Sequence, residues 1–180
     1  SRMEALISEM TMILKQLPNN TKVGLTSFSS SGYGNNKEWS ESKTGLVRLG
    51  DEGKRDSAIQ FVNTLDNERV TRWGGTDPWN AIQKAFDDTE TDTLYLMSDG
   101  QPNRDRNGGR WSSWDHQSTA DYYAGENNNR KHDGKDRALI VNTTSLGLES
   151  PWLEKLSELT QGYYNQIDKN SLTEEQDKSS

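Results

Sequence analysis

Two short segments of the chain combine glycine with oxygen-bearing side chains that could hold a metal ion. The first is Gly74-Gly75-Thr76-Asp77; the second, about twenty residues later, is Ser98-Asp99-Gly100 at the end of an apolar run. Hydroxyl and carboxylate oxygens are hard ligands, which suit Mg²⁺, Mn²⁺ or Ca²⁺ rather than soft metals. Ordinary turn chemistry is the alternative, because threonine can cap a following helix and Asp-Gly is a common turn. Taken by their spacing alone, the two segments favour turns, so the elements around them matter.

The pattern of apolar residues predicts alternating helices and strands. Spacings of three and four indicate amphipathic helices over residues 2–17, 54–65, 79–86 and 151–159. Strands are predicted over residues 22–28, 46–49, 93–97, 138–141 and 163–167, with 93–97 buried on both faces. Residues 29–42 are predicted as a loop, and 103–136 as a long polar segment with a helix from about 115 to 128. This alternation predicts an α/β fold with a mainly parallel sheet, in which ligands bind at the carboxyl ends of the strands.

The order of these elements, together with Gly-Gly-Thr-Asp and an apolar strand ending in Ser-Asp-Gly-x-Pro, resembles the von Willebrand factor A family. The resemblance extends to about Asp168. It implies a Rossmann-like three-layer sandwich, with one domain over residues 1–168 and a polar tail or linker over 169–180. It also implies a metal-ion-dependent adhesion site, in which Thr76 and Asp99 are metal ligands while Ser98 and Asp77 support them.

Such a site implies binding rather than catalysis. The cation, Mg²⁺ or else Mn²⁺ or Ca²⁺, would keep an open position for a carboxylate of another protein or of a surface polymer. The resemblance therefore implies an adhesion or assembly module, of bacterial and extracellular or cell-surface type. The alternative is a metal-free structural or assembly module that has kept the fold and lost the site.

The chain departs from the family pattern at its start. The family's first loop carries Asp-x-Ser-x-Ser a few residues before the first helix, whereas residues 2–17 already match that helix. We expect that the chain is a piece of a longer protein, with the first strand and loop upstream. Alternatively, another segment of the chain fills the gap. Metal occupancy is left open for the same reason.

Trp111 and Trp114 are prominent in the polar segment 103–136. Tryptophan is enriched at binding hot spots, so both rings could contact a ligand beside the metal loops. They could equally cover a small cluster of the segment's own residues. The segments 103–136 and 29–42 are both expected to shape specificity.

Composition argues against several other functions. The net charge is -7 without a block of Lys or Arg, which argues against nucleic acid, and the chain has no cysteine for disulfide or thiolate chemistry. No apolar run reaches membrane-spanning length, so no membrane insertion is expected. His116 and His132 are predicted at the surface, without partners for a zinc site or a catalytic triad. No nucleophile elbow or phosphate-binding loop is found, so we expect no enzymatic activity.

Overall fold

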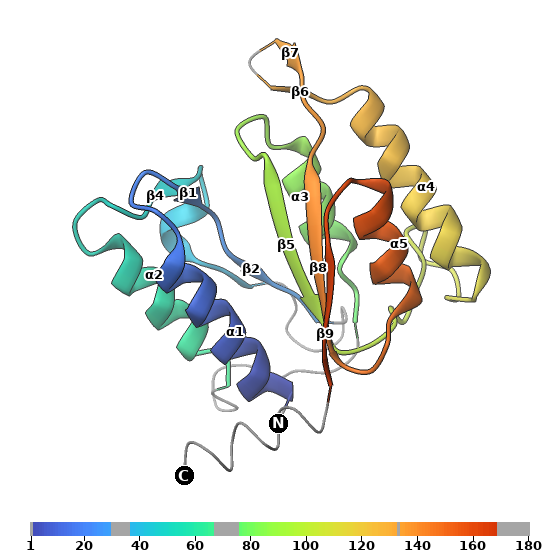
Figure 1. Ribbon diagram of the computed structural model, residues 1–180, viewed down its shortest axis with the longest axis horizontal. Coiled ribbons are helices and arrows are strands. Elements are labelled where there is room, and N and C mark those ends of the chain that lie inside the picture. Colours follow the sequence, from blue (N-terminus) through green and yellow to red (C-terminus); the bar gives the residue numbers. More distant parts are fainter. Residues whose placement is uncertain (1, 30–36, 67–75, 133, 169–180) are drawn as a thin grey trace. The chain divides into compact units, whose positions relative to one another are not determined.

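The chain divides into two compact units, Ser1–Gly75 and Thr76–Ser180. The computed structural model describes residues 2–29, 37–66, 76–132 and 134–168 (Figure 1). Gly74 and Gly75, part of the predicted loop 29–42 and the predicted tail 169–180 lie outside the described residues. The prediction of one domain over residues 1–168 stays a prediction.

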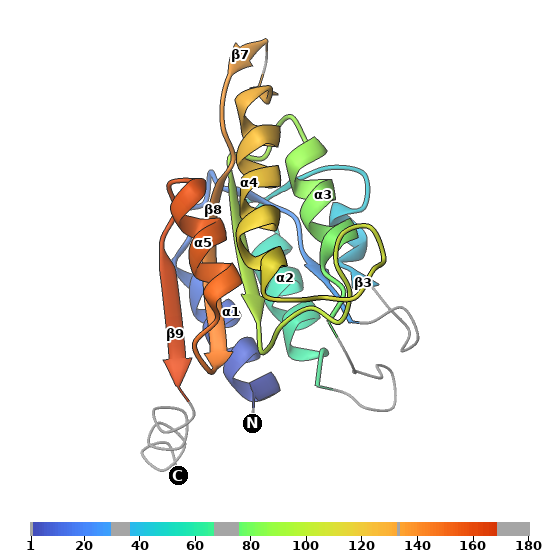
Figure 2. The same cartoon turned by 90° about the vertical axis from the view of Figure 1, so that its right-hand side faces the viewer.

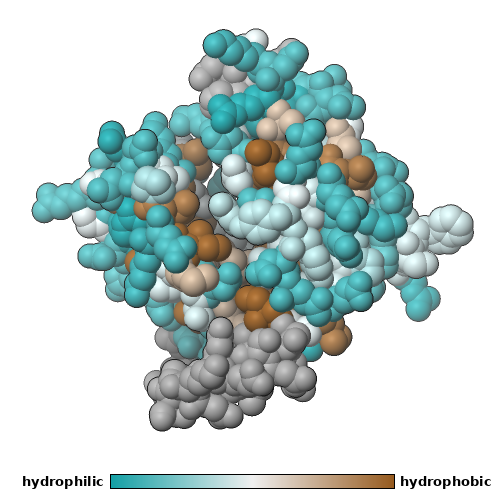
Figure 3. All heavy atoms as spheres, in the orientation of Figure 1, coloured by the Kyte–Doolittle hydropathy of each residue, from teal (hydrophilic) through white to brown (hydrophobic). Residues whose placement is uncertain are grey.

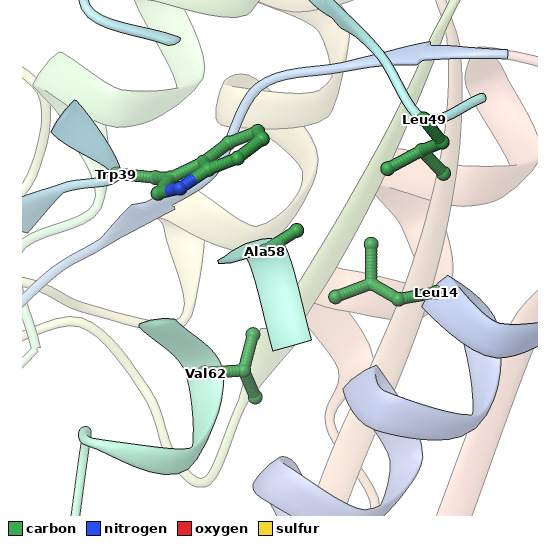
Figure 4. Close-up of a cluster of buried hydrophobic side chains, with 5 residues drawn as sticks. All are labelled: Leu14, Trp39, Leu49, Ala58 and Val62. Carbon is green, nitrogen blue, oxygen red and sulfur yellow. The ribbon is translucent and has the colours of Figure 1, made fainter. Parts of the chain in front are cut away.

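Two helices carry the core of the first unit. α1 spans Arg2–Gln16 and α2 spans Lys54–Asn63, as the apolar spacing predicts. Figure 4 shows the buried cluster between them: Leu14, Trp39, Leu49, Ala58 and Val62. Trp39 Nε1 donates a hydrogen bond to Ser57 Oγ at 3.1 Å, so the polar atom of this buried ring has a partner.

The single strand predicted over residues 22–28 is wrong. The unit contains two antiparallel pairs of two-residue strands, β1 (Lys22–Val23) with β4 (Val47–Arg48) and β2 (Thr26–Ser27) with β3 (Lys37–Glu38). The break lies at Leu25, whose N–H donates to Ser42 Oγ at 3.3 Å and whose carbonyl accepts the Trp39 N–H at 3.0 Å. These partners are distant in sequence, so local alternation could not reveal them. The described end of the loop predicted over residues 29–42 is also structured. It contains β3 and the 3-10 helix η1 (Ser40–Ser42).

Three parallel strands form the sheet of the second unit, in the order β5-β8-β9. They are β5 (Thr93–Ser98), β8 (Ile140–Gly147) and β9 (Tyr164–Asp168). Their helices are α3 (Trp79–Asp87), α4 (Trp114–Asn128) and α5 (Pro151–Leu159). The prediction of a mainly parallel sheet flanked by helices is confirmed for this unit. Tyr95 is 36% exposed, so β5 is not buried on both faces along its whole length.

β8 extends well beyond the strand predicted over residues 138–141. The added residues are mostly polar, yet they are buried. Thr143 is 0% exposed and its Oγ1 donates to the Leu153 carbonyl at 2.9 Å, while Asn142 Oδ1 accepts the Tyr163 N–H at 3.0 Å. Because these neighbours satisfy the polar groups, a polar run can occupy a buried strand.

The predicted helix in the polar segment 103–136 is present as α4, and a hairpin that was not predicted follows it. β6 (Lys131–His132) pairs antiparallel with β7 (Lys135–Asp136). Arg130 lies at the base of this hairpin, is 7% exposed and donates to four carbonyl oxygens. They belong to Phe86, Asp88, Thr91 and Arg137. The buried guanidinium therefore ties the hairpin to the end of α3.

The visible surface of the described residues is mostly hydrophilic. Figure 3 shows apolar residues only in small separate groups on this face. Within the described ranges, we find no helix whose length and apolarity would allow it to cross a lipid bilayer.

Three helices begin where the strands of the second unit end, at what we call the carboxyl edge. A helix that connects two parallel strands starts at the edge where the preceding strand finishes. α4 follows β5 and α5 follows β8, so both start at this edge (Figure 2). Trp79, the first residue of α3, has its ring centroid 5.7 Å from that of Trp152 on α5. α3 therefore begins at the same edge.

Candidate functional site

Thr76 is held through its backbone by Asn103. The Thr76 N–H donates to Asn103 Oδ1, and the Asn103 N–H donates to the Thr76 carbonyl at 2.9 Å. Thr76 is 8% exposed, so these contacts also satisfy backbone groups that have little access to water. We call this reciprocal pair the Thr76–Asn103 clasp. It fixes the segment that leads into α3 against the segment that follows β5.

Asp99 lies in the turn that ends β5, and its side chain is exposed. Ser98, the last residue of the strand, is buried, and its Oγ donates to the Gly100 carbonyl at 3.1 Å. Asn103 is the fourth residue after Asp99, so their Cα atoms can be at most about 14 Å apart. The clasp therefore brings Thr76 to the same loop as Asp99, although the two residues belong to segments distant in sequence.

A hydroxyl oxygen and a carboxylate, as on Thr76 and Asp99, fit the chemistry of Mg²⁺, Mn²⁺ or Ca²⁺. Two such donors do not complete an octahedral site, and within the described residues no group of three or more His, Asp or Glu could hold a metal. Asp77 is half-buried, and Pro78 rather than Asp77 occupies the N-cap position of α3. The Ser98 hydroxyl donates a hydrogen bond within the turn, and its supporting role stays a prediction, as does that of Asp77.

An aromatic cluster lies beside these loops at the carboxyl edge. The ring centroids of Trp79, Trp111 and Trp152 are 5.7–5.9 Å apart in each pair. Trp79 Nε1 donates to the Arg104 carbonyl at 2.9 Å, and Trp111 Nε1 donates to Gln101 Oε1 at 3.2 Å. Trp111 therefore packs against tryptophans of α3 and α5. The apolar spacing predicts helices over 79–86 and 151–159 but not the contact between Trp79 and Trp152. Each of these residues follows a proline at a helix start, and this shared pattern could have indicated that both rings lie where a helix begins.

His116 belongs to the same cluster, so this residue, predicted at the surface, is half-buried. Its ring centroid lies 5.7 Å from that of Trp111, and its Nε2 is buried without a hydrogen-bond partner among the described residues. Burial lowers the pKa of His116, and the charge of Lys155 lowers it further while Asp115 opposes the shift. His116 is therefore held mainly as a neutral ring against the aromatic cluster at physiological pH.

Trp114 differs from Trp111, because its side chain is 86% exposed at the first residue of α4. A ring of this size gains little stability from such a position, so Trp114 remains available for contact with a ligand. Of the two tryptophans in the polar segment, one is therefore part of the packing and the other is presented to solvent.

The loop between Asn103 and Trp111 is ordered by its own hydrogen bonds. Asp105 Oδ1 accepts the N–H groups of Asn107 and Gly109, each at 2.8 Å. Gly108 has φ +85°, a conformation that favours glycine. The guanidinium of Arg106 lies 3.1 Å from the ring centroid of Tyr122 on α4, so the loop is also attached to that helix.

Comparisons with known proteins support the fold. No family model and no curated protein matches this sequence. The structure is similar to that of an aerotolerance-related membrane protein from Bacteroides fragilis with multiple mutations to serines, with a TM-score of 0.58 and 13% identity over 98% of this chain and 86% of that chain. It is also similar to a conserved hypothetical protein, BatB, from Bacteroides thetaiotaomicron, with a TM-score of 0.56 and 14% identity over 99% and 87% of the two chains.

At such low identity these likenesses show the fold alone. They agree with the parallel sheet and its helices in confirming the predicted Rossmann-like α/β class. These likenesses do not test the predicted metal ligands, the predicted cation or the predicted partner, which stay predictions.

Proposed function

We propose that the chain is a non-enzymatic module that binds another protein, or a surface polymer, through a divalent cation at the carboxyl edge. Thr76 and Asp99 contribute a hydroxyl and a carboxylate to Mg²⁺, or to Mn²⁺ or Ca²⁺. The observation that carries this proposal is the Thr76–Asn103 clasp, because it joins the threonine segment to the loop of Asp99. An acidic group of the partner fills an open position of the cation.

The surroundings of the two residues support a binding role. Trp114 presents an exposed ring at the start of α4, and large exposed aromatic side chains are typical of binding hot spots. The loop from Asn103 to Trp111 is held rigid by Asp105, which limits the entropy lost on binding. As part of this proposal, the module acts outside the cell or at the cell surface.

Titration of the chain with Mn²⁺, followed by electron paramagnetic resonance, tests the proposal. We expect one weak site, with a dissociation constant on the order of 10⁻³ M, because few protein groups reach the cation. Thr76→Ala and Asp99→Asn should abolish this binding. Thr89→Ala and Asp121→Asn change exposed residues of the same types on the second unit and should leave it intact. Absence of binding, or binding unaffected by Thr76→Ala, would overturn the proposal.

The second candidate is a metal-free assembly module. It is favoured by the absence, within the described ranges, of a cluster of acidic or histidine side chains able to hold a metal by itself. This candidate predicts that Mn²⁺ gives no saturable signal, while the exposed ring of Trp114 still contributes to assembly. The Mn²⁺ titration therefore separates the two candidates directly.

A further inference from the structure

Asn103 makes two different hydrogen bonds to one residue, Thr76, which lies 27 positions away in the sequence. Its side-chain Oδ1 accepts the Thr76 N–H, and its own N–H donates to the Thr76 carbonyl. Two bonds in opposite directions fix both the distance and the orientation of the Thr76 backbone. A single contact would leave Thr76 free to rotate about it.

The residues just before Asn103 restrict its position. Pro102 is buried, and its ring fixes its own φ and restricts Gln101 to extended conformations. Gln101 is held in turn by Trp111, whose Nε1 donates to its Oε1 at 3.2 Å. The path from Asp99 to Asn103 is therefore short and restricted at Gln101 and Pro102, so a position fixed at Asn103 limits where Asp99 can lie.

A second hydrogen bond joins the same loop to the first residue of α3. Trp79 Nε1 donates to the carbonyl of Arg104, the residue after Asn103, at 2.9 Å. Asn103 and Arg104 together bind Thr76, just before α3, and Trp79, the first residue of α3. The Trp79 contact keeps α3 against the loop, whereas the Asn103 contact determines where Thr76 itself lies.

We propose that Asn103 is a positioning residue, which holds Thr76 beside the loop of Asp99 and thereby sets the affinity of the cation site. This inference rests on the proposed function. Groups that orient metal ligands without touching the metal typically contribute a factor of about 10–100 in affinity. Asn103 acts on the backbone of Thr76, so its loss should move the hydroxyl without removing it.

The experiment compares Asn103→Ala, Asn103→Asp and Asn107→Ala with the unmodified chain. Asn103→Ala removes the acceptor, and Mn²⁺ affinity should fall by about tenfold or more. Asn103→Asp keeps an acceptor oxygen and should retain at least the original affinity. Asn107→Ala is the matched control, because the contact of Asn107 with Asp105 uses its backbone N–H, which alanine keeps.

Two measurements make the outcomes distinct. Amide hydrogen exchange of Thr76, measured by NMR without metal, should accelerate in Asn103→Ala and not in Asn107→Ala. If the unmodified chain binds Mn²⁺ and Thr76→Ala abolishes binding, but Asn103→Ala binds as tightly as before, the positioning role is overturned and the proposed function stands. If the unmodified chain binds no Mn²⁺, the proposed function fails and this inference fails with it. A loss of thermal stability with unchanged Mn²⁺ affinity in the folded protein would show a merely structural role and overturn the inference.

Discussion

The ring of His116 packs against that of Trp111, with centroids 5.7 Å apart and the two planes inclined by 38°. The contact joins the first turn of α4 to the segment that follows β5. It also buries His116 Nε2 without a partner among the described residues. A proton added to this nitrogen would therefore place a charge in a poorly solvated position, close enough to Lys155 to feel its repulsion.

This contact should make the stability of the second unit depend on pH. The pKa of His116 in the folded chain is lowered from the ordinary value of 6.5 by burial and by Lys155, with Asp115 opposing. The unfolded chain therefore takes up the proton first, and stability rises with pH in this range. The contribution is complete above about pH 6.5 and is lost as the pH falls from there through the lower pKa of the folded state.

Urea unfolding followed by tryptophan fluorescence at pH 7.5, 6.0 and 5.0 measures the effect. His116→Gln should reduce the change in unfolding free energy over this range. Equal pH dependence in the His116→Gln variant and the unmodified chain would contradict the prediction.

Trp152 and Trp114 should respond very differently to the same substitution. Trp152 is 1% exposed and contacts two other tryptophans, so Trp152→Ala leaves a cavity and should lower the unfolding free energy by about 3–5 kcal/mol. Trp114 is 86% exposed, and Trp114→Ala should change it by no more than about 0.5 kcal/mol. Chemical denaturation of both variants tests this pair. A large loss for Trp114→Ala would show that the ring is packed rather than presented.

Gly162 and Gly125 form a second matched pair. A Cβ at Gly162 would collide with the backbone carbonyl of Val141, whose carbon would lie only 2.6 Å away, so Gly162→Ala should destabilise by about 1–3 kcal/mol. Gly125 lies inside α4, and a Cβ there meets nothing within 4 Å. Gly125→Ala should stabilise by about 0.5–1 kcal/mol, because glycine is a poor helix former. Thermal unfolding of both variants measures the two effects. Midpoints that shift in the same direction in Gly162→Ala and Gly125→Ala would contradict this prediction.

Arg130 should matter far more than its neighbour Arg137. Arg130→Met removes every hydrogen bond from the buried guanidinium and leaves carbonyl groups without partners, which should cost about 3 kcal/mol or more. Arg137 makes an exposed ion pair with Asp92 at 3.0 Å, so Arg137→Met should cost about 1 kcal/mol or less. Arg137→Met keeps the backbone carbonyl that accepts a hydrogen bond from Arg130, so this variant is a suitable control. Similar losses in both variants, measured by urea unfolding, would show that the buried network does not stabilise the unit.

Local sequence patterns were sufficient for the helices and for the class of fold. Apolar spacing predicts α1, α2, α3 and α5 within a few residues of their ends, because a helix face is a property of residues three and four apart. The apolar run at 93–97 and the short run at 138–141 likewise mark two strands of the parallel sheet, β5 and β8. The positions of Thr76 and Asp99 at element boundaries follow from the same patterns.

Tertiary structure decided what those patterns do not encode. Residues 22–28 break into two strands because Leu25 is bound by Ser42 and Trp39. β8 continues through a polar run because Leu153 and Tyr163 satisfy buried polar side chains of that run. The clasp between Thr76 and Asn103 likewise joins groups far apart in the chain. Each of these depends on which distant group satisfies a buried polar atom, and that is settled only when the chain has folded.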